Sequence, residues 1–427
     1  MNKRWLIGAC LAAAALLAGC HSGGRNQNST DMRTLNAVVD AEPLDTLVDT
    51  NTCSSAIAFG GTSGYCSFDS GNREIRIRSS TTQAILVDKT LSFGSDTNQT
   101  MVLYGRRASI QTLALTDDTP SPDSGKLKIR VAEFSPEASA VDLYLVTSSD
   151  ISSAAATITG AAYPVATDYV EINPGSYQII LTLSGTKDVI FQAPARDFAV
   201  GSVLTLVVLP SLGGKLVSAT LLSAGSNASA TLLTNSSSRL KAVNAIQGTT
   251  LLNFKLDGGV LFSNVPYQGT SSYVVVPSGS HSLAIEASNA PGSNLASITS
   301  QLAPARDYSL VAQNSTSNAG VVLFADDNTV PSTGFARVRF ANVMPAGSTN
   351  VDVLVNFASE VTGLAPGTAS PYFTLAALNS YTVSFTTPGG VSVLATLNTA
   401  ALNNLGVYTI YLFGSPTAPQ PVAVEDR

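Results

Sequence analysis

The chain has 427 residues, a formal net charge of −6 and only 12% charged residues, and this length predicts several domains rather than one small core. A mildly acidic chain does not favour binding to nucleic acid, which needs clustered cations facing phosphates. With two histidines and four cysteines in the whole chain, we expect no enzyme and no bound cofactor.

Residues 1–19 are predicted to form a lipoprotein signal peptide. Two cations, Lys3 and Arg4, precede an apolar stretch too short to span a bilayer. The leader ends Leu-Ala-Gly-Cys at residues 17–20, which resembles the lipobox of bacterial lipoproteins. The resemblance implies cleavage before Cys20 and acylation of that residue. The alternative is an ordinary signal peptide with an incidental cysteine.

Acylation at Cys20 predicts a protein held in the cell envelope, because several acyl chains together anchor firmly. No acidic residue follows Cys20, so in a Gram-negative cell we expect the outer membrane, on its periplasmic face or at the cell surface. Residues 20–31 are small and polar, which is typical of a flexible tether.

The first predicted module covers residues 32–118. Cys53 and Cys66 flank a glycine-rich stretch, and two such thiols outside the cytoplasm are expected to form a disulfide. A loop of this size gives roughly 3 kcal/mol. The alternative, a metal or redox pair, is disfavoured by a spacing far from Cys-x-x-Cys. Residues 74–78 alternate charged and apolar side chains, as in a half-buried strand.

Three further segments, 126–223, 239–327 and 335–427, repeat this pattern of short strands bounded by turns. The alternating stretch 127–131 has a close counterpart in 336–340. The expected fold class is therefore all-β, with four tandem immunoglobulin-like β-sandwich modules. Four such modules in series predict a rod-like array on a lipid tether.

A six-residue phrase also occurs twice, Ala-Pro-Ala-Arg-Asp followed by an aromatic residue, at 193–198 and 303–308. We interpret it as marking equivalent points of two modules. Its Arg196–Asp197 and Arg306–Asp307 steps are predicted to be local ion pairs, worth at most about 1 kcal/mol if exposed. The alternative is a recognition motif.

Residues 135–144, Ser-Pro-Glu-Ala-Ser-Ala-Val-Asp-Leu-Tyr, resemble the opening signature of the bacterial family called domain of unknown function 4397. Module two resembles the family well, module four does so through 344–346 and 351–353, and modules one and three only weakly. The resemblance implies secreted or lipid-anchored sandwich domains. It supplies no catalytic residues.

Two features are candidate sites. His281 is a possible catalytic base, but it follows a tight turn where modules two and four have tyrosine, which favours a packing role. The acidic module junctions are candidate Ca²⁺ ligands, against the alternative of solvated turns that end a strand. The junction aspartates are Asp117, Asp118, Asp123, Asp326 and Asp327.

We therefore expect a non-enzymatic envelope protein that acts as a scaffold, spacer or adhesin. The alternative is a surface protein that binds carbohydrate or peptide, which predicts an exposed aromatic patch or an open sheet edge on one module only. The expected partners are the membrane, through the lipid anchor, and an unidentified envelope protein or glycan, with no nucleic acid.

Overall fold

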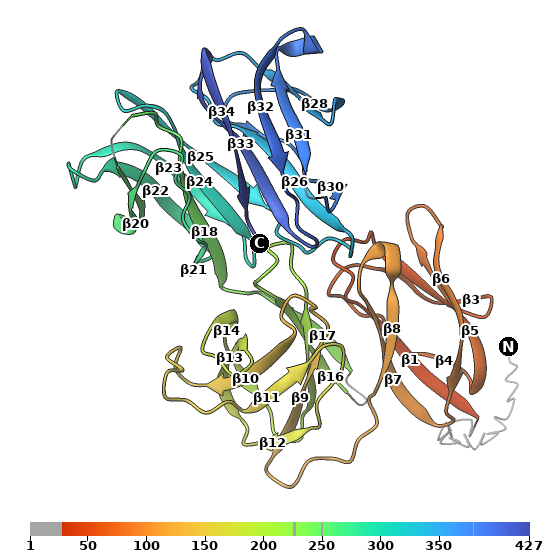
Figure 1. The fold of residues 1–427 in the computed structure, drawn as a ribbon. Coiled ribbons are helices and arrows are strands. Elements are labelled where there is room, and N and C mark those ends of the chain that lie inside the picture. Colours follow the sequence, from red (N-terminus) through yellow and green to blue (C-terminus); the bar gives the residue numbers. More distant parts are fainter. Residues whose placement is uncertain (1–27, 225–227, 249–250, 379) are drawn as a thin grey trace, which may run out of the picture.

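The computed structural model describes residues 28–427 except 225–227, 249–250 and 379. The predicted lipidation site Cys20 lies outside the described residues. The described chain forms four consecutive β-sandwich modules (Figure 1). Within these residues, no helix has the length and apolar character needed to cross a membrane.

Modules one and two contain most of their residues in short strands. Module one consists of β1 Ser29–Asn36, β2 Leu44–Val48, β3 Asn51–Ile57, β4 Cys66–Asp69, β5 Gly71–Ser79, β6 Ile85–Phe93, β7 Thr97–Tyr104, the 3-10 turn η1 Arg107–Ser109 and β8 Gln111–Thr116. Module two consists of β9 Leu127–Glu133, β10 Ala140–Val146, β11 Ile158–Ala162, β12 Val170–Ile172, β13 Gly175–Leu183, β14 Val189–Phe198, β15 Val203–Leu209, β16 Ser218–Ser223 and β17 Ser229–Leu233.

Modules three and four repeat the pattern. Module three consists of β18 Ser237–Asn244, β19 Leu252–Leu256, β20 Gly259–Val265, β21 Val274–Pro277, β22 Gly279–Ala287, β23 Asn294–Leu302, β24 Asp307–Ser315 and β25 Asn318–Asp326. Module four consists of β26 Phe335–Asn342, β27 Val351–Val355, β28 Ala358–Leu364, β29 Thr368–Ala369, β30 Phe373–Ala376, β31 Tyr381–Thr386, the 3-10 turn η2 Pro388–Gly390, β32 Val393–Ala400, β33 Val407–Ser415 and β34 Ala418–Glu425.

Each module packs two sheets face to face, and we call the sheet that contains the module's first strand its opening sheet. The strand orders of the four opening sheets are β4-β1-β7-β8, β12-β9-β15-β16-β17, β21-β18-β24-β25 and β29-β26-β33-β34. In each of them the first strand runs parallel to a strand near the end of the module, while the other pairs are antiparallel. This parallel pairing places the first strand of every module beside a strand near its end.

The two central strands of each opening sheet are largely buried on both faces. In β9, Leu127, Ile129 and Val131 lie in the core of module two, as their alternation predicts. Lys128 and Arg130, which the same alternation places towards water, are also buried. The physical reason is that module one covers this face of the sheet.

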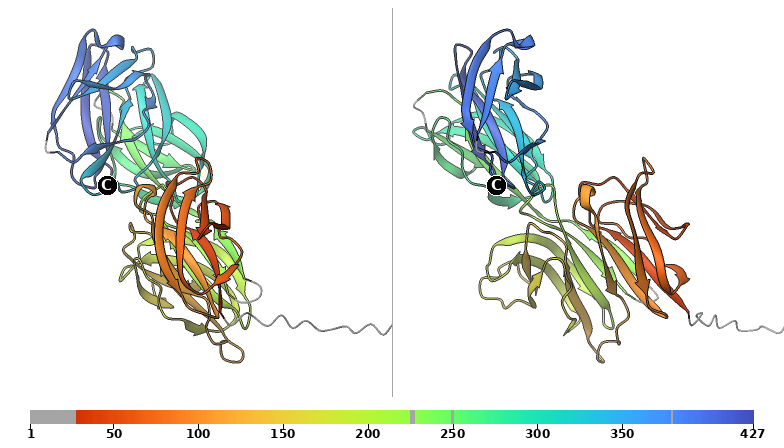
Figure 2. Two further views of the ribbon diagram at one scale, coloured as in Figure 1. Left: turned by 90° about the vertical axis from the view of Figure 1, so that its right-hand side faces the viewer. Right: turned by 45° about the vertical axis from the view of Figure 1, so that its right-hand side comes forward.

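The modules therefore associate in two pairs, and the predicted rod of modules in series is wrong (Figures 1 and 2). An apolar cluster that includes Leu35, Val102, Phe134 and Val207 joins the opening sheets of modules one and two. Modules three and four share a corresponding cluster. Because each opening sheet has a second apolar face, a neighbouring module is needed to remove it from water.

Module two ends later than the sequence indicates. Residues 225–238 have the composition of a loose linker, yet β17 lies among them and adds a fifth strand to the opening sheet. Between the two pairs, the loop at Gly213 and Gly214 contacts the backbone of Ala305 and Asn328. A Cβ atom on Gly214, which has φ +86°, would overlap the Asn328 carbonyl, so this close approach needs glycine.

Candidate functional site

Each module places a tyrosine ring over a cation of its opening strand. Each tyrosine immediately precedes a strand that pairs with the opening strand, so the ring lies beside it. Such contacts attract through the negative face of the ring. The distances from cation to ring centre are 5.1 Å for Arg33 and Tyr65, 4.6 Å for Arg130 and Tyr169, 5.1 Å for Lys241 and Tyr273, and 4.8 Å for Arg339 and Tyr372.

A hydroxyl group two residues before each tyrosine fixes this arrangement. It accepts a hydrogen bond from the backbone N–H of the residue that follows the cation. The distances are 2.8 Å for Ser63, 3.2 Å for Thr167, 2.9 Å for Ser271 and 3.0 Å for Ser370. The Ser/Thr-x-Tyr pattern therefore has the same structural role in all four modules.

Two more positions belong to this arrangement. One is a hydroxyl residue on the parallel neighbour strand, and the other is a residue at the end of the module's last strand or just beyond it. We call the cation, the tyrosine and these two residues the quartet of the module. The hydroxyl residues are Thr100, Thr205, Ser309 and Thr409. The last position holds Asp117, Ala224, Asp326 and Asp426 in modules one to four. Its backbone N–H reaches the carbonyl of an equivalent strand residue in modules one, two and four, at 2.8, 3.1 and 2.7 Å.

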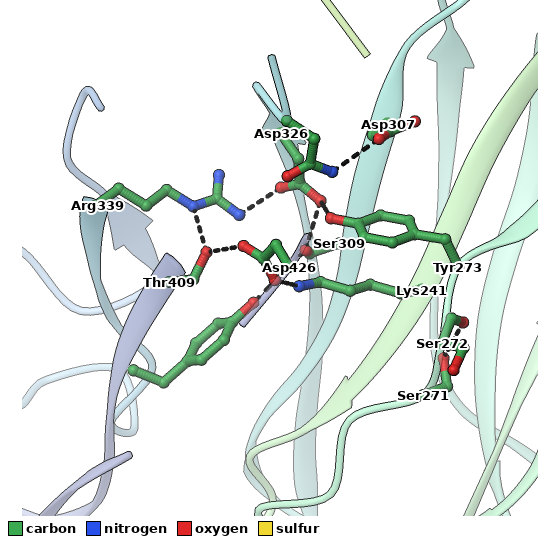
Figure 3. A network of polar contacts seen from close by, with 12 residues as sticks. Lys241, Ser271, Ser272, Tyr273, Asp307, Ser309, Asp326, Arg339, Thr409 and Asp426 are labelled. Carbon is green, nitrogen blue, oxygen red and sulfur yellow. Dashed lines mark hydrogen bonds and ion pairs between the residues drawn. The ribbon is translucent and has the colours of Figure 1, made fainter. Parts of the chain in front are cut away.

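In the pair of modules three and four, each cation binds the carboxylate of the other module (Figure 3). Lys241 forms an ion pair with Asp426, and Arg339 forms one with Asp326. Thr409 donates to Asp426 at 2.6 Å, and Tyr273 donates to Asp326 at 2.6 Å. All four charged side chains are at most 2% exposed.

In this network, the opposite charges of the buried side chains offset the effect of burial on their pKa values. Burial alone would lower the pKa of Lys241, but Tyr411 and the carboxylates of Asp426 and Asp326 outweigh it and raise that pKa above its ordinary value. Burial would raise the pKa of Asp326, yet Arg339 and Lys241 hold it below its ordinary value. The side chains of Lys241 and Asp326 therefore keep their charges at neutral pH.

The pair of modules one and two has the same network with one carboxylate missing. Arg33 lies 3.3 Å from Asp117 of its own module and donates to Thr100 at 2.7 Å. It also donates to the Ser223 carbonyl across the interface at 3.0 Å, as Arg339 does to the Ala325 carbonyl. The next residue, where module four has aspartate, is Ala224.

A polar cleft of about 1270 Å³ opens at this position between modules one and two. Arg33, Tyr65 and Ala224 lie on its wall. Its other lining residues are mostly small or polar and include Asp31, Thr62, Ser63, Asn98, Asp117, Asp118, Thr119, Ser121, Ser202 and Ser223. The cavity between modules three and four has about 600 Å³, and its lining mixes apolar residues such as Phe324 and Pro371 with polar ones such as Arg339 and Ser370.

The profile of the family described as Domain of unknown function (DUF4397) matches residues 30–144 and 238–348, together just over half of the chain. The chain belongs to the DUF4397 family. Both matches begin at the first strand of a module pair and continue into the second module. Modules one and three, whose sequence motifs resemble the family only weakly, thus lie inside the matched regions of this DUF4397 protein.

Comparisons with other proteins add no functional argument. No curated protein matches the sequence. The Bacillus anthracis TIE protein is 12% identical over 92% of this chain and 68% of its own, with a TM-score of 0.16. A structure of alpha-glucan binding by a streptococcal virulence factor is 12% identical over 42% of this chain and 93% of its own, with a TM-score of 0.17.

His281 of the DUF4397 protein lies in β22 and is buried. Its Nδ1 lies 2.7 Å from Oδ2 of Asp257, and this contact lowers the pKa of Asp257 below its ordinary value. Nε2 is buried and has no hydrogen-bond partner among the described residues. A ring nitrogen without contact to solvent cannot reach a substrate, so the geometry favours the packing role.

The acidic junctions form bonds within the protein. Besides its contacts with Arg33 and Thr100, Asp117 accepts a hydrogen bond from Tyr65 at 2.5 Å. Asp118 accepts bonds from Asn98, and Asp327 pairs with Arg337 at 2.9 Å. Within the described ranges, no group of three or more His, Cys, Asp and Glu residues gathers as a metal site would require. Calcium binding at the junctions stays a prediction.

The repeated six-residue phrase does not mark equivalent positions. Phe198 pairs with Gly175, and the corresponding partner of Gly279 is Leu302, so the second copy is shifted by six residues along the module. The predicted Arg306–Asp307 ion pair is wrong, because Asp307 is buried at the start of β24 and pairs with Arg239. The Nε–Oδ1 distance of that pair is 2.8 Å.

The structure joins Cys53 and Cys66 in a disulfide, with Cα atoms 5.6 Å apart. It connects β3 of the second sheet to β4 of the opening sheet. The disulfide therefore holds the two layers of module one together next to the cleft wall at Tyr65.

The quartets were missed by the sequence reasoning, although a signal for them exists. Each module has a Ser/Thr-x-Tyr that begins 30 to 37 residues after the opening cation, at 63–65, 167–169, 271–273 and 370–372, although module four contains a second copy at 409–411. No sequence motif marks the carboxylate position of the quartet, so that position is recognised only from the strand pairing.

Proposed function

We propose that this DUF4397 protein is a non-enzymatic, lipid-anchored envelope protein that binds a carbohydrate in the cleft between modules one and two. The observation that carries the proposal is an asymmetry. Two module pairs share one architecture, yet the polar cleft of the first pair, about 1270 Å³, is about twice as large as the 600 Å³ cavity at the same place in the second pair. A cleft lined by hydroxyl, amide and carboxylate groups matches the hydroxyls of a sugar better than an apolar peptide.

The anchor completes the proposal. Acylation at Cys20 holds the protein in the envelope, in the outer membrane of a Gram-negative cell, and the tether leaves the cleft able to meet a surface polymer. A Cys20→Ala variant is expected to leave the membrane fraction. Recovery of that variant with the membranes would contradict lipid anchoring.

The binding test is a glycan array with the mature protein and two variants. Ser121 is exposed in the cleft lining, and Ser332 is exposed in the corresponding loop of the second pair. Ser121→Trp is expected to abolish binding by filling the cleft, while Ser332→Trp is the matched control and is expected to bind normally. Absence of glycan binding, or equal binding by both variants, would contradict the proposal.

A scaffold or spacer role is the second candidate. It is supported by the glycine contact between the pairs, since the backbone of Gly213 and Gly214 packs directly on the second pair and fixes one pair against the other. Small-angle scattering of the mature protein is expected to show one defined shape, with the two module pairs in a fixed arrangement that glycans do not change. A broad distribution of shapes would contradict a spacer.

A further inference from the structure

The charges buried around the quartets balance in one module pair but not in the other. In the second pair, the buried cations Arg239, Lys241 and Arg339 face the buried carboxylates of Asp307, Asp326 and Asp426. In the first pair, the buried cations are Arg33, Lys128 and Arg130, and Asp117 is the buried carboxylate that faces them. By strand register, Lys128 stands where module four has Arg337, and the place of Arg239 is held by Asp31. Buried cations are costly unless anions or dipoles compensate them.

Carbonyl and hydroxyl oxygens partly replace the missing anions. Lys128 donates to Thr119 at 2.7 Å and also to Pro120, and Arg130 donates to the Thr116 carbonyl at 2.9 Å. Arg33 differs from these two cations because it lines the cleft. Its position corresponds to Lys241, whose ammonium group binds Asp426.

From this comparison we infer that the cleft takes a ligand carboxylate at the place that Asp426 occupies in the second pair, against Arg33 and beside Ala224. This inference rests on the carbohydrate function proposed above and narrows its substrate class to an acidic sugar, such as a uronate. The carboxylate accepts charge-assisted hydrogen bonds from the guanidinium group. The sugar hydroxyls meet the polar side chains that line the rest of the cleft.

The outer part of the cleft limits how much negative charge the ligand carries. Asp31 is half-buried and Asp118 is exposed, and both line the cleft. These carboxylates accept hydrogen bonds from sugar hydroxyls but repel a dense polyanion. A sugar with one carboxylate per residue therefore fits the cleft better than a polyphosphate.

The test uses titration calorimetry of the mature protein with trimers of galacturonate, glucuronate and mannuronate, each paired with its methyl ester. The ester removes the charge and keeps the hydroxyls. At least one acid trimer is expected to bind about tenfold or more tightly than its ester. In Ala224→Asp, the new side chain occupies the carboxylate position, so this preference is expected to fall below about twofold. Ala224→Asn is the neutral control and keeps the preference.

The outcomes separate the two proposals. Equal affinity for acid and ester, or an undiminished acid preference in Ala224→Asp, overturns the carboxylate inference and leaves carbohydrate binding intact. Binding of neutral sugars alone has the same effect. Failure of every glycan to bind overturns the proposed function as well. Thermal melting confirms folding, since Ala224→Asp supplies a counter-ion to Arg33 and is expected to melt no lower than the natural protein.

Discussion

Removing the Asp426 carboxylate is the sharpest test of the network between modules three and four. Asp426→Ala gives the second pair the residue that module two has at Ala224 and leaves the ammonium group of Lys241, 2% exposed, without its counter-ion. Loss of one partner from a buried ion pair costs about 3–5 kcal/mol, because the remaining charge stays buried. We expect a loss of unfolding free energy of this size.

The companion variant Lys241→Met/Asp426→Ala removes both charges. Its expected cost is about 1 kcal/mol or less, since replacing a buried pair by apolar groups is often neutral. The single tryptophan of the chain, Trp5, lies in the predicted leader, so urea unfolding is followed by far-ultraviolet circular dichroism. Hydrogen exchange of β18 and β33 then localises the effect to the second pair.

Glu360→Ala, which removes an exposed acid of the same module, is the control and is expected to change stability by less than about 0.5 kcal/mol. The reasoning is refuted if Asp426→Ala costs less than 1 kcal/mol. It is also refuted if the double variant is as unstable as the single one, because the damage would then not come from an uncompensated ammonium group.

Three other perturbations have expected outcomes. Burial raises the pKa of Glu133 well above 4.5, and its Oε2 has no hydrogen-bond partner among the residues that the structure describes. The natural protein should therefore lose stability relative to Glu133→Gln as the pH rises above 4.5, by about 1–3 kcal/mol at pH 7.5. Equal pH profiles of stability by calorimetry would contradict this. Below pH 4.5 the two proteins should be similar. Cys53→Ser should cost about 3 kcal/mol by urea unfolding, and no loss would mean that the disulfide is not formed in the mature protein. EDTA should leave the melting temperature unchanged, because Arg33 and Arg339 already compensate Asp117 and Asp326, and a fall of more than about 2 °C would instead support calcium at the junctions.

The all-β modules were predictable because strand alternation is a local property. The pairing of modules was not, since Lys128 and Arg130 produce the same alternation whether water or another module covers them. The phrase at 193–198 and 303–308 was misleading because six letters can match while strand register differs. The candidate cleft required the structure, since Ala224 is informative only when aligned with three aspartates that strand pairing makes equivalent.

Glu133 shows the same limit at a single position. In the other three modules an asparagine stands there, and its side chain donates to a backbone carbonyl at 2.9, 2.9 and 3.1 Å while it accepts the N–H two residues ahead. The Glu133 carboxylate keeps only the acceptor half of this role. The position of Glu133 is recognised as equivalent to the three asparagines only from the strand register. The sequence alone therefore does not reveal that Glu133 is an exception.

The double-sided burial of the opening sheets determines how such chains can be divided and enlarged. A cut near residue 120 would expose both an apolar face and the buried cations of β9, so an isolated module two should aggregate. A cut between β17 and β18 separates one complete module pair from the next. The smallest unit that can be duplicated without exposing an apolar sheet face is therefore the pair of modules. Gene duplication would accordingly lengthen these proteins by two modules at each step.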